Sequence, residues 1–318
     1  MPKVSVCIPA YNQVKYLKRT IDSILNQTFS DYEIIITDDS STDIVFNLVQ
    51  EYQMPEKIKY HKNLPTLGSP ENWNESIRKA SGEYIKIVHH DDWLNSNESL
   101  AKYVKLLDDN LDADLGFSAT RVVKQDGTEY THQLSDGQLE IVKLNPLVLF
   151  RDNFIGAPSA VIFRKNTNIL FDPKIKWLVD KEYYIRQLEN NKNIVYDPEL
   201  LIVTFLAEGR VTDECCNNKE IEIFEFFYVL QKIYKKKIKY SKDALSQSIV
   251  TVMNICNKYR ITNTNEIRQC GYKGKIPYPI KKSLSNYFYL IKKAERVIQI
   301  CNQNLRRMIG LLTIHIFK

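Results

Sequence analysis

The sequence lacks the features that mark several large classes of protein. No run approaches the roughly 18 consecutive apolar residues that a membrane-spanning helix requires. The first residues run straight into strand-like sequence, without the apolar stretch and cleavage site of a signal peptide, and this predicts a cytoplasmic protein. The six cysteines show no CxxC spacing, so we expect reduced thiols instead of disulfides or a zinc site.

Two common nucleotide-binding signatures are also missing. No G-x-G-x-x-G follows the first strand-like segment, and no G-x-x-x-x-G-K-[ST] occurs anywhere in the chain. These absences argue against a dehydrogenase and against a nucleoside triphosphatase of the P-loop type. No RNA- or DNA-binding motif is present, so nucleic acid is not an expected partner.

Charge is unevenly distributed along the 318 residues, whose net charge is +6. Residues 1–218 carry 24 Lys and Arg against 32 Asp and Glu, a net charge of −8. Residues 219–318 carry 20 against 6, a net charge of +14. Such a basic segment favours an anionic partner, and we expect the surface of an anionic membrane.

The first third of the chain alternates short apolar strands with amphipathic helices. We predict strands at 3–9, 33–37, 58–61 and 83–89, and helices at 16–26, 43–52 and 72–80. This order predicts an α/β fold with a parallel sheet, in which ligands bind at the carboxyl ends of the strands. The later predicted elements are strands at 116–124, 160–164 and 194–196, and helices at 145–150, 180–189, 221–234, 241–259 and 281–308.

Three polar clusters follow the predicted strands: Pro9–Asn12, Asp38–Asp43 and His89–Trp93. A single acidic pair is usually a solvated turn or a helix N-cap, and an N-cap suits Asp43. Two acidic pairs at neighbouring strand ends converge, however, and converging carboxylates repel each other unless a cation neutralises them. Oxygen ligands favour Mg²⁺ or Mn²⁺, with positions left open for phosphate oxygens.

The order of these motifs resembles glycosyltransferase family 2, a family of inverting enzymes with the GT-A fold. VSVCIPAYN, DDSSTD and GEYIKIVHHDDW are similar to the family's first strand, acidic turn and DxD-like motif. The resemblance implies a Rossmann-like, mixed and mainly parallel sheet flanked by helices in residues 1–213. It divides them into a nucleotide-binding half, 1–115, and an acceptor half, 116–213. A basic helical region, 214–318, would follow.

The resemblance also implies roles for individual residues. Pro9, Tyr11 and Asp39 would line the nucleotide base, and Asp91 would belong to the same nucleotide site. Asp92, as the last carboxylate of the DxD-like motif, would be the ligand of Mn²⁺ or Mg²⁺.

A catalytic base is needed to take the proton of the acceptor hydroxyl. KWLVDKEYYIRQL resembles the family's E-D-x-[DE]-L-x-x-R pattern, although Val179 replaces its usual Glu. The match implies that Asp180 is the base, with Trp177 and Glu182 on the acceptor side. The alternatives are a helix N-cap for Asp180 and an i,i+4 surface pair with Arg186 for Glu182.

A later stretch, FLAEGRVT, aligns with a loop that carries a His in many members of the family. Ala207 stands at the place of that His. Arg210 would then contact the diphosphate, because a guanidinium suits phosphate. The alternative is an ordinary surface arginine.

These observations predict inverting transfer from a nucleotide-diphosphate sugar, with a UDP-sugar favoured, to a lipid-linked glycan acceptor. Similarity to enzymes of O-antigen and capsule synthesis places this reaction at the inner face of the bacterial cytoplasmic membrane. Basic and apolar positions alternate from Lys281 onward and predict an amphipathic helix on that surface. Packing on the catalytic domain, or a homodimer, is the other interpretation of these helices. The alternative function is a non-catalytic module of this fold, anchored by its basic tail.

Overall fold

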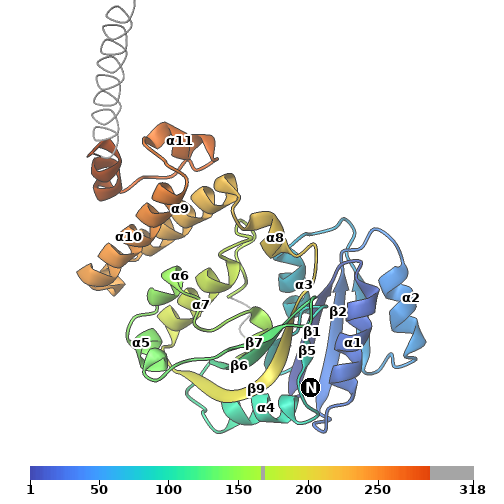
Figure 1. Ribbon diagram of the computed structural model, residues 1–318. Coiled ribbons are helices and arrows are strands. Elements are labelled where there is room, and N and C mark those ends of the chain that lie inside the picture. The colour runs from blue at the N-terminus through green and yellow to red at the C-terminus, as the bar shows by residue number, and fades with distance from the viewer. Residues whose placement is uncertain (166–168, 287–318) are drawn as a thin grey trace, which may run out of the picture. The chain divides into compact units, whose positions relative to one another are not determined.

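The computed structural model describes residues 1–165 and 169–286 (Figure 1). The chain forms two compact units, one comprising Met1–Cys216 and the other beginning at Asn217. From residue 287 onward, the predicted basic helix at 281–308 lies outside the described residues. Within the described part of the chain, no helix has the length and apolar character needed to cross a membrane.

The first unit alternates strands and helices along most of its length. Its elements are β1 (Val4–Ala10), α1 (Val14–Leu25), β2 (Tyr32–Asp38), α2 (Ile44–Glu51), β3 (Ile58–Lys62), α3 (Glu71–Lys79), β4 (Tyr84–Ile87), β5 (Trp93–Leu94), α4 (Ser99–Asp108), β6 (Leu115–Lys124), β7 (Glu129–His132), α5 (Gln138–Leu144), α6 (Val148–Arg151), η1 (Pro158–Ala160), β8 (Val161–Arg164), α7 (Val179–Asn190), β9 (Ile194–Leu206) and α8 (Val211–Cys215).

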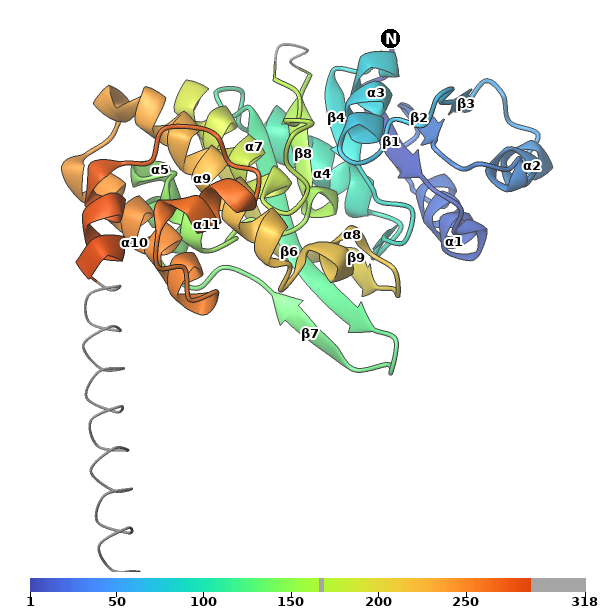
Figure 2. The same ribbon diagram turned by 90° about the horizontal axis from the view of Figure 1, so that it is seen from above.

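The strands form one mixed sheet in the order β3-β2-β1-β4-β8-β6-β9-β5, with β7 beside β6. Strands β3, β2, β1 and β4 are mutually parallel. Strand β8 runs antiparallel to both β4 and β6, whereas β6 and β9 are parallel. The predicted mixed, mainly parallel sheet flanked by helices is confirmed. Figure 2 shows β7 beside the end of β6, to which it is antiparallel.

Helices α1 and α3 cover opposite faces of β1 and β2 (Figures 1 and 2). Alternate strand residues point to opposite faces. Val6 and Ile34 therefore pack in one core cluster with Leu17 of α1. Cys7 Sγ and Thr37 Oγ1, which face the other way, donate to backbone carbonyls of α3. The continuous apolar runs of both strands thus reflect burial on two faces.

Several elements differ from the sequence-based expectation. The helix expected at 145–150 is replaced by α5 and α6, and α4, β5 and β7 were not predicted. Strand β9 has 13 residues, although only 194–196 were predicted. Its register with β6 skips Pro198 and Glu199, which form a bulge. Proline lacks the N–H that a ladder requires, so the bulge accommodates it and the strand continues.

The second unit contains α9 (Lys219–Lys235), η2 (Lys237–Lys239), α10 (Lys242–Lys258) and α11 (Thr264–Gln269). The helices predicted at 221–234 and 241–259 correspond to α9 and α10. Their contact includes a carboxylate, that of Glu222, which is 2% exposed and accepts from Lys258 Nζ at 2.8 Å. The rings of Phe227 and Tyr272 also pack together, with centroids 5.4 Å apart.

Gly82 has no room for a side chain, which gives a test of the packing before β4. A Cβ at this position would lie 2.5 Å from Ser5 N and 2.7 Å from Val4 C. Gly82→Ala should therefore lower the free energy of unfolding by about 1–3 kcal/mol, as overpacking does. Chemical denaturation measures this change in the free energy of unfolding. Gly116→Ala is the matched control, because the nearest atom there is a movable methyl of Leu106. Equal losses in the two variants would contradict this account.

Candidate active site

Three strand ends meet at the carboxyl end of β1. The backbone N–H of Asp39, after β2, donates to Ala10 O at 3.0 Å. A ring nitrogen of His90, after β4, lies 3.3 Å from Pro9 O. Tyr11 follows directly, with 57% of its surface exposed. The predicted nucleotide residues and the acidic turn after β4 are therefore brought to one edge of the sheet.

Asp39 anchors the loop between β3 and α3. Its carboxylate is almost fully buried and accepts from Asn63 Nδ2 at 2.7 Å, Leu67 N at 3.0 Å and Gly68 N at 2.7 Å. A carboxylate offers about four acceptor positions. Three donors of the chain occupy three acceptor positions of the Asp39 carboxylate, so one position is left for a ligand.

Helix α1 holds the backbone of the acidic turn. Thr20 Oγ1 lies 2.6 Å from Asp92 O and 3.0 Å from His90 O. The adjacent Arg19 donates from Nη2 to Asp91 O at 3.2 Å. The hydroxyl of Thr20 has one proton, and its shortest contact is with Asp92 O, so α1 supplies donors for the carbonyls of Asp91 and Asp92. These bonds fix where the two carboxylates emerge.

Arg19 is also enclosed by aromatic rings. Its guanidinium carbon lies 3.5 Å from the ring centre of Trp93 and 4.9 Å from that of Phe205. Burial lowers its pKa, while the charges of Asp91 and Asp92 raise it. Arg19 lines an open pocket of about 470 Å³. The other lining residues are Lys15, Tyr16, Gln125, Phe205 and Glu208.

The two adjacent acids have different surroundings. Asp92, the predicted metal ligand, is 2% exposed, and its Oδ1 accepts from Phe205 N at 3.0 Å. Burial, and then the charge of Asp91, raise the pKa of Asp92 well above its usual range. Asp91 is only half-buried. Of the pair, Asp91 is therefore the acid that is more open to a ligand.

His89 lies beside the acids and is half-buried, although its Nε2 atom is enclosed. Its ring packs on Trp73, with centroids 4.7 Å apart, and its backbone N–H donates to Ser159 Oγ at 3.0 Å. Burial lowers the pKa of His89 to about 4, so its imidazole is neutral at neutral pH. Within the described residues, His89 Nε2 has no hydrogen-bond partner. A neutral imidazole with a vacant nitrogen is a form that ligates metals.

The donor set suits a metal held jointly by protein and ligand. Across residues 1–165 and 169–286, no three His, Cys, Asp or Glu side chains are grouped so that they alone would hold an ion. Asp91 nevertheless offers an accessible carboxylate. Mg²⁺ is typically bound by one or two carboxylates together with substrate phosphates. The residues therefore fit an ion whose remaining ligands come from a diphosphate.

Asp180, the predicted base, lies in the first turn of α7, whose N-cap is Leu178. Its Oδ2 accepts from Asn153 Nδ2 at 2.6 Å, and its Oδ1 from Lys181 N at 2.8 Å. Burial raises the pKa of Asp180, whereas these hydrogen bonds lower it. Asn153 and Ser159 belong to one short segment, 153–160. This segment joins Asp180 to the turn that carries Asp91.

The other predicted acceptor and diphosphate residues are engaged locally. Glu182 Oε1 accepts from Arg186 Nε at 2.7 Å, and the Glu182 side chain is 3% exposed. The i,i+4 pair exists, but it is buried and does not lie on the surface. Arg210 pairs with Asp213 at 2.9 Å and belongs to the cap of α8. Trp177 lies half-buried just before α7.

Comparison with known proteins agrees with this geometry. The profile of the family described as "Glycosyl transferase family 2" matches residues 5–182. The uncharacterized glycosyltransferase MJ1057 of Methanocaldococcus jannaschii is 30% identical over 244 residues, covering 74% of this chain and 81% of that protein. A GalNAc(5)-diNAcBac-PP-undecaprenol beta-1,3-glucosyltransferase of Campylobacter jejuni is 41% identical over 98 residues, 30% of this chain and 32% of its own length.

Solved structures share the fold. Residues 1–349 of S. aureus TarS, in complex with UDP-GlcNAc, superpose with a TM-score of 0.61 at 20% identity, covering 81% of this chain and 73% of that one. The mannosyltransferase PcManGT of Pyrobaculum calidifontis, in complex with GDP-Man and Mn²⁺, gives 0.53 at 16% identity, covering 93% and 86%. The fold and the family match define a nucleotide-sugar glycosyltransferase with the GT-A fold. The chain belongs to glycosyltransferase family 2.

The residues that support the acids were missed by sequence reasoning. Arg19 and Thr20 lie within an ordinary amphipathic helix, and Asn153 within a loop. Ser159 falls in a Gly-Ala-Pro-Ser segment that the sequence allows to be either an acceptor loop or a plain turn. The one available signal was Thr20, a polar residue on the apolar, buried face of α1.

Thr20 provides a test of how firmly α1 holds the acidic turn. Thr20→Val keeps the shape of the side chain but removes the hydroxyl that donates to Asp92 O. Leaving that buried carbonyl unpaired should lower the free energy of unfolding by about 1–3 kcal/mol. Thr28→Val is the control, because Thr28 is exposed and bonds Asn97 O at 3.1 Å. Its effect should stay within about 0.5 kcal/mol in the same denaturation experiment. An equally stable Thr20→Val protein would show that the turn does not depend on α1.

Proposed function

We propose that this chain transfers a sugar, with inversion at the anomeric carbon, from a UDP-sugar to a hydroxyl of a lipid-linked glycan. The observation that carries the proposal is the segment 153–160. It bonds the backbone of the acidic turn through Ser159 and the carboxylate of Asp180 through Asn153. The proposed diphosphate site and the half-buried proposed base are thereby joined, as displacement at an anomeric carbon requires.

The donor occupies the carboxyl end of β1 in this proposal. The exposed ring of Tyr11 offers a face for the base, and Pro9 is buried at the end of β1 beside it in the sequence. The acceptor position that Asp39 retains suits the imide N–H of uracil. The S. aureus TarS structure, which has the same fold, holds UDP-GlcNAc. A uridine donor is therefore favoured.

The metal site in this proposal centres on Asp91 instead of Asp92. Asp91 is half-buried, whereas the Asp92 carboxylate is enclosed and bonded to the backbone of β9. Asp91 would hold Mn²⁺ or Mg²⁺ beside His89, and Asp92 would set the conformation of the turn. When bound, such an ion neutralises the negative charge that develops on the departing diphosphate. PcManGT, another protein of this fold, binds Mn²⁺ together with its sugar nucleotide.

Asp180 takes the proton of the acceptor hydroxyl onto a carboxylate oxygen. Asn153 orients that carboxylate through its bond to Oδ2. Burial raises the pKa of Asp180, which makes it a stronger base than an exposed aspartate. Trp177, just before α7, lies on the acceptor side. Arg210, which pairs with Asp213, caps α8 in this scheme and does not contact the diphosphate.

The setting we propose is the anionic inner face of a bacterial membrane, where surface polysaccharides are assembled. Two observations support it. The Campylobacter relative acts on an undecaprenol-linked glycan, and residues 219–318 of this chain carry a net charge of +14. Each basic residue near such a surface contributes roughly 1 kcal/mol to binding.

A donor panel tests the function. UDP-, GDP- and dTDP-sugars are incubated with the protein, Mn²⁺ and a polyprenyl-diphosphate-linked glycan, and release of nucleoside diphosphate is measured. We expect release from UDP-sugars and a product of inverted anomeric configuration. A product that retains the donor's configuration would contradict the single-displacement mechanism. A protein that binds donors but never releases nucleotide would be the non-catalytic module.

Removal of the metal or of its ligand should abolish transfer. Asp91→Asn should reduce turnover by at least about 100-fold, because the leaving diphosphate loses charge stabilisation worth several kcal/mol. EDTA should do the same to the unaltered enzyme, and added Mn²⁺ should restore it. Asp109→Asn is the control, since Asp109 is exposed and pairs with Lys105. Full turnover in EDTA would rule out the metal-dependent mechanism.

Removal of the base should separate chemistry from donor binding. Asp180→Asn should leave the donor KM near its original value while turnover falls by about two to four orders of magnitude. The acidic limb of the pH–rate profile should disappear as well, because activity falls as pH drops through the raised pKa of Asp180.

Stability provides the control for the same variant. A buried acid with a raised pKa destabilises the fold once pH exceeds the pKa of the unfolded chain, because the charged form is disfavoured only in the folded state. Asp180→Asn removes this cost, so the thermal midpoint at neutral pH should not fall. A large loss of stability would attribute the lost activity to unfolding. Asp152→Asn, at a neighbouring exposed acid, should keep full turnover.

A further inference from the structure

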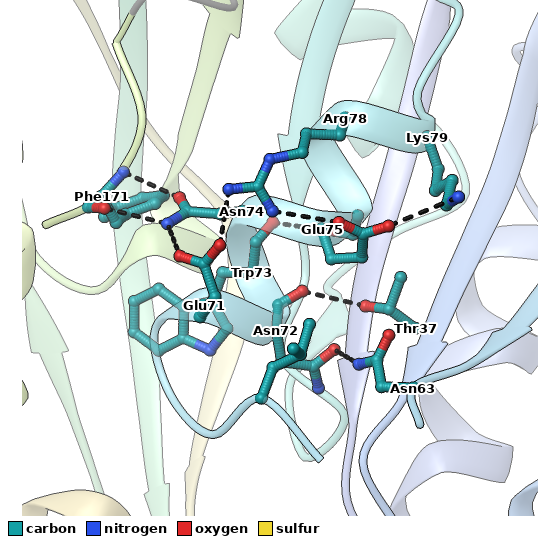
Figure 3. Close-up of polar contacts among 12 residues, drawn as sticks. Thr37, Asn63, Glu71, Asn72, Trp73, Asn74, Glu75, Arg78, Lys79 and Phe171 are labelled. Carbon is teal, nitrogen blue, oxygen red and sulfur yellow. Dashed lines mark hydrogen bonds and ion pairs between the residues drawn. The ribbon is translucent and has the colours of Figure 1, made fainter. Parts of the chain in front are cut away.

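Helix α3 contacts both the donor end of the sheet and the segment that leads to Asp180. Figure 3 shows its polar side chains, with Asn72 directed toward Asn63 and Asn74 directed toward Phe171. Asn72 and Asn74 are 5% and 1% exposed. Buried amides on a helix are costly unless every polar atom is paired, so this arrangement specifies a geometry.

Asn74 binds the backbone of Phe171 on both sides. Its Nδ2 donates to Phe171 O at 2.9 Å, and its Oδ1 accepts from Phe171 N at 2.8 Å. Nδ2 also donates to Glu71 Oε2 at 2.8 Å. The side-chain amide therefore pairs with Phe171 as a neighbouring strand would. The two bonds to Asn74 therefore fix the position of the Phe171 backbone relative to α3.

Phe171 in turn packs on the helix that carries the base. Its ring stacks on Tyr183 of α7, with centroids 4.1 Å apart and planes 21° from parallel. The edge of the same ring meets Trp73, at 5.2 Å. Tyr183 lies three residues after Asp180, on the next turn of α7. A shift of Phe171 therefore displaces the first turn of that helix.

The other end of α3 contacts the donor edge. Asn72 Nδ2 donates to Ala10 O at 3.3 Å, and Asn72 Oδ1 accepts from Asn63 Nδ2 at 2.9 Å. Asn63 also donates to the carboxylate of Asp39. The donor edge and the path to Asp180 are thus attached to one helix, at two residues that are only two positions apart.

We propose that Asn74 is a positioning residue for sugar transfer: through Phe171 and Tyr183 it fixes the turn of α7 that carries Asp180 relative to the bound donor. This inference rests on the proposed function, in which Asp180 is the base. Asn74 contacts neither the donor nor the acceptor in this scheme. Its loss should therefore weaken the chemical step of transfer without weakening donor binding.

The test compares transfer with the slow hydrolysis of the donor by water. Asn74→Ala removes both bonds to Phe171. Transfer turnover should fall by about 10- to 100-fold, since a misplacement of 1 Å can cost 100-fold. Donor KM and donor hydrolysis should stay within about twofold, because neither depends on the placement of an acceptor against its base. Hydrogen exchange at the Phe171 amide should accelerate. Lys79→Ala is the control on the same helix, as Lys79 is exposed and pairs with Glu75.

A second variant keeps the inference testable if Asn74→Ala fails to fold. Phe171→Leu preserves the backbone pairing with Asn74 but removes the ring that stacks on Tyr183. It should produce the same separation of transfer from hydrolysis.

The outcomes distinguish this inference from the proposed function. A parallel fall of transfer and hydrolysis at unchanged donor KM would indicate a smaller fraction of folded enzyme, and it would overturn the positioning role. Unchanged transfer in both variants would overturn it as well, while the proposed function would stand. If the unaltered protein releases no nucleotide from any donor, the proposed function fails, and the inference fails with it.

Discussion

The carbonyl oxygens at the carboxyl end of β1 are the constraint on which the site depends. A strand that ends leaves peptide groups without a ladder partner, and buried peptide groups must be paired. Ala10 O accepts from the backbone N–H of Asp39 and from the side chain of Asn72, and Pro9 O faces the His90 ring. Pairing these two oxygens therefore draws in the ends of β2 and β4 and the start of α3. The edge of the sheet at which we propose that the donor binds is thus assembled by pairing the backbone of one strand.

The electrostatics of the acidic turn follow from the same packing. Asp91 and Asp92 repel each other, and burial adds to the cost of ionising Asp92. Two basic side chains that precede the turn in the sequence hold its surroundings. Arg19 donates to Asp91 O, and Lys86, fully buried in β4, donates to the carbonyl oxygens of Ser159 and Val161. Lys86 thereby holds the segment that bonds His89 N. These two side chains donate to carbonyl oxygens, so they fix the turn and leave the Asp91 carboxylate open.

Sequence reasoning located the strand ends better than it located their partners. The apolar runs of β1, β2 and β4 each end in polar residues, so the topology of a parallel sheet was enough to bring those residues together. By contrast, nothing in the sequence distinguishes the adjacent acids Asp91 and Asp92 from each other. Asp92 is enclosed because Phe205, 113 residues later, donates its N–H, and β9 reaches that point only by continuing past Pro198. Pro198 is a residue at which a strand is expected to end, but the pairing of β9 with β6 continues beyond it. The wrong length predicted for β9 and the unforeseen enclosure of Asp92 therefore share one cause.

The linkage through α3 illustrates why buried amides appear where apolar residues would pack at lower cost. Apolar contacts tolerate small slips, because dispersion attraction is not directional. An amide that must satisfy both a donor and an acceptor tolerates far fewer positions, since a slip leaves a polar atom unpaired. The Asn74 amide bonds both the N–H and the carbonyl oxygen of Phe171. The ring of Phe171 stacks on Tyr183, so the position of Phe171 determines where Tyr183 packs. The directional hydrogen bonds thus fix Phe171 relative to α3, and the stacking of its ring on Tyr183 makes the contact with α7 rigid. A reaction that needs a base aligned with a bound donor gains from this order of interactions.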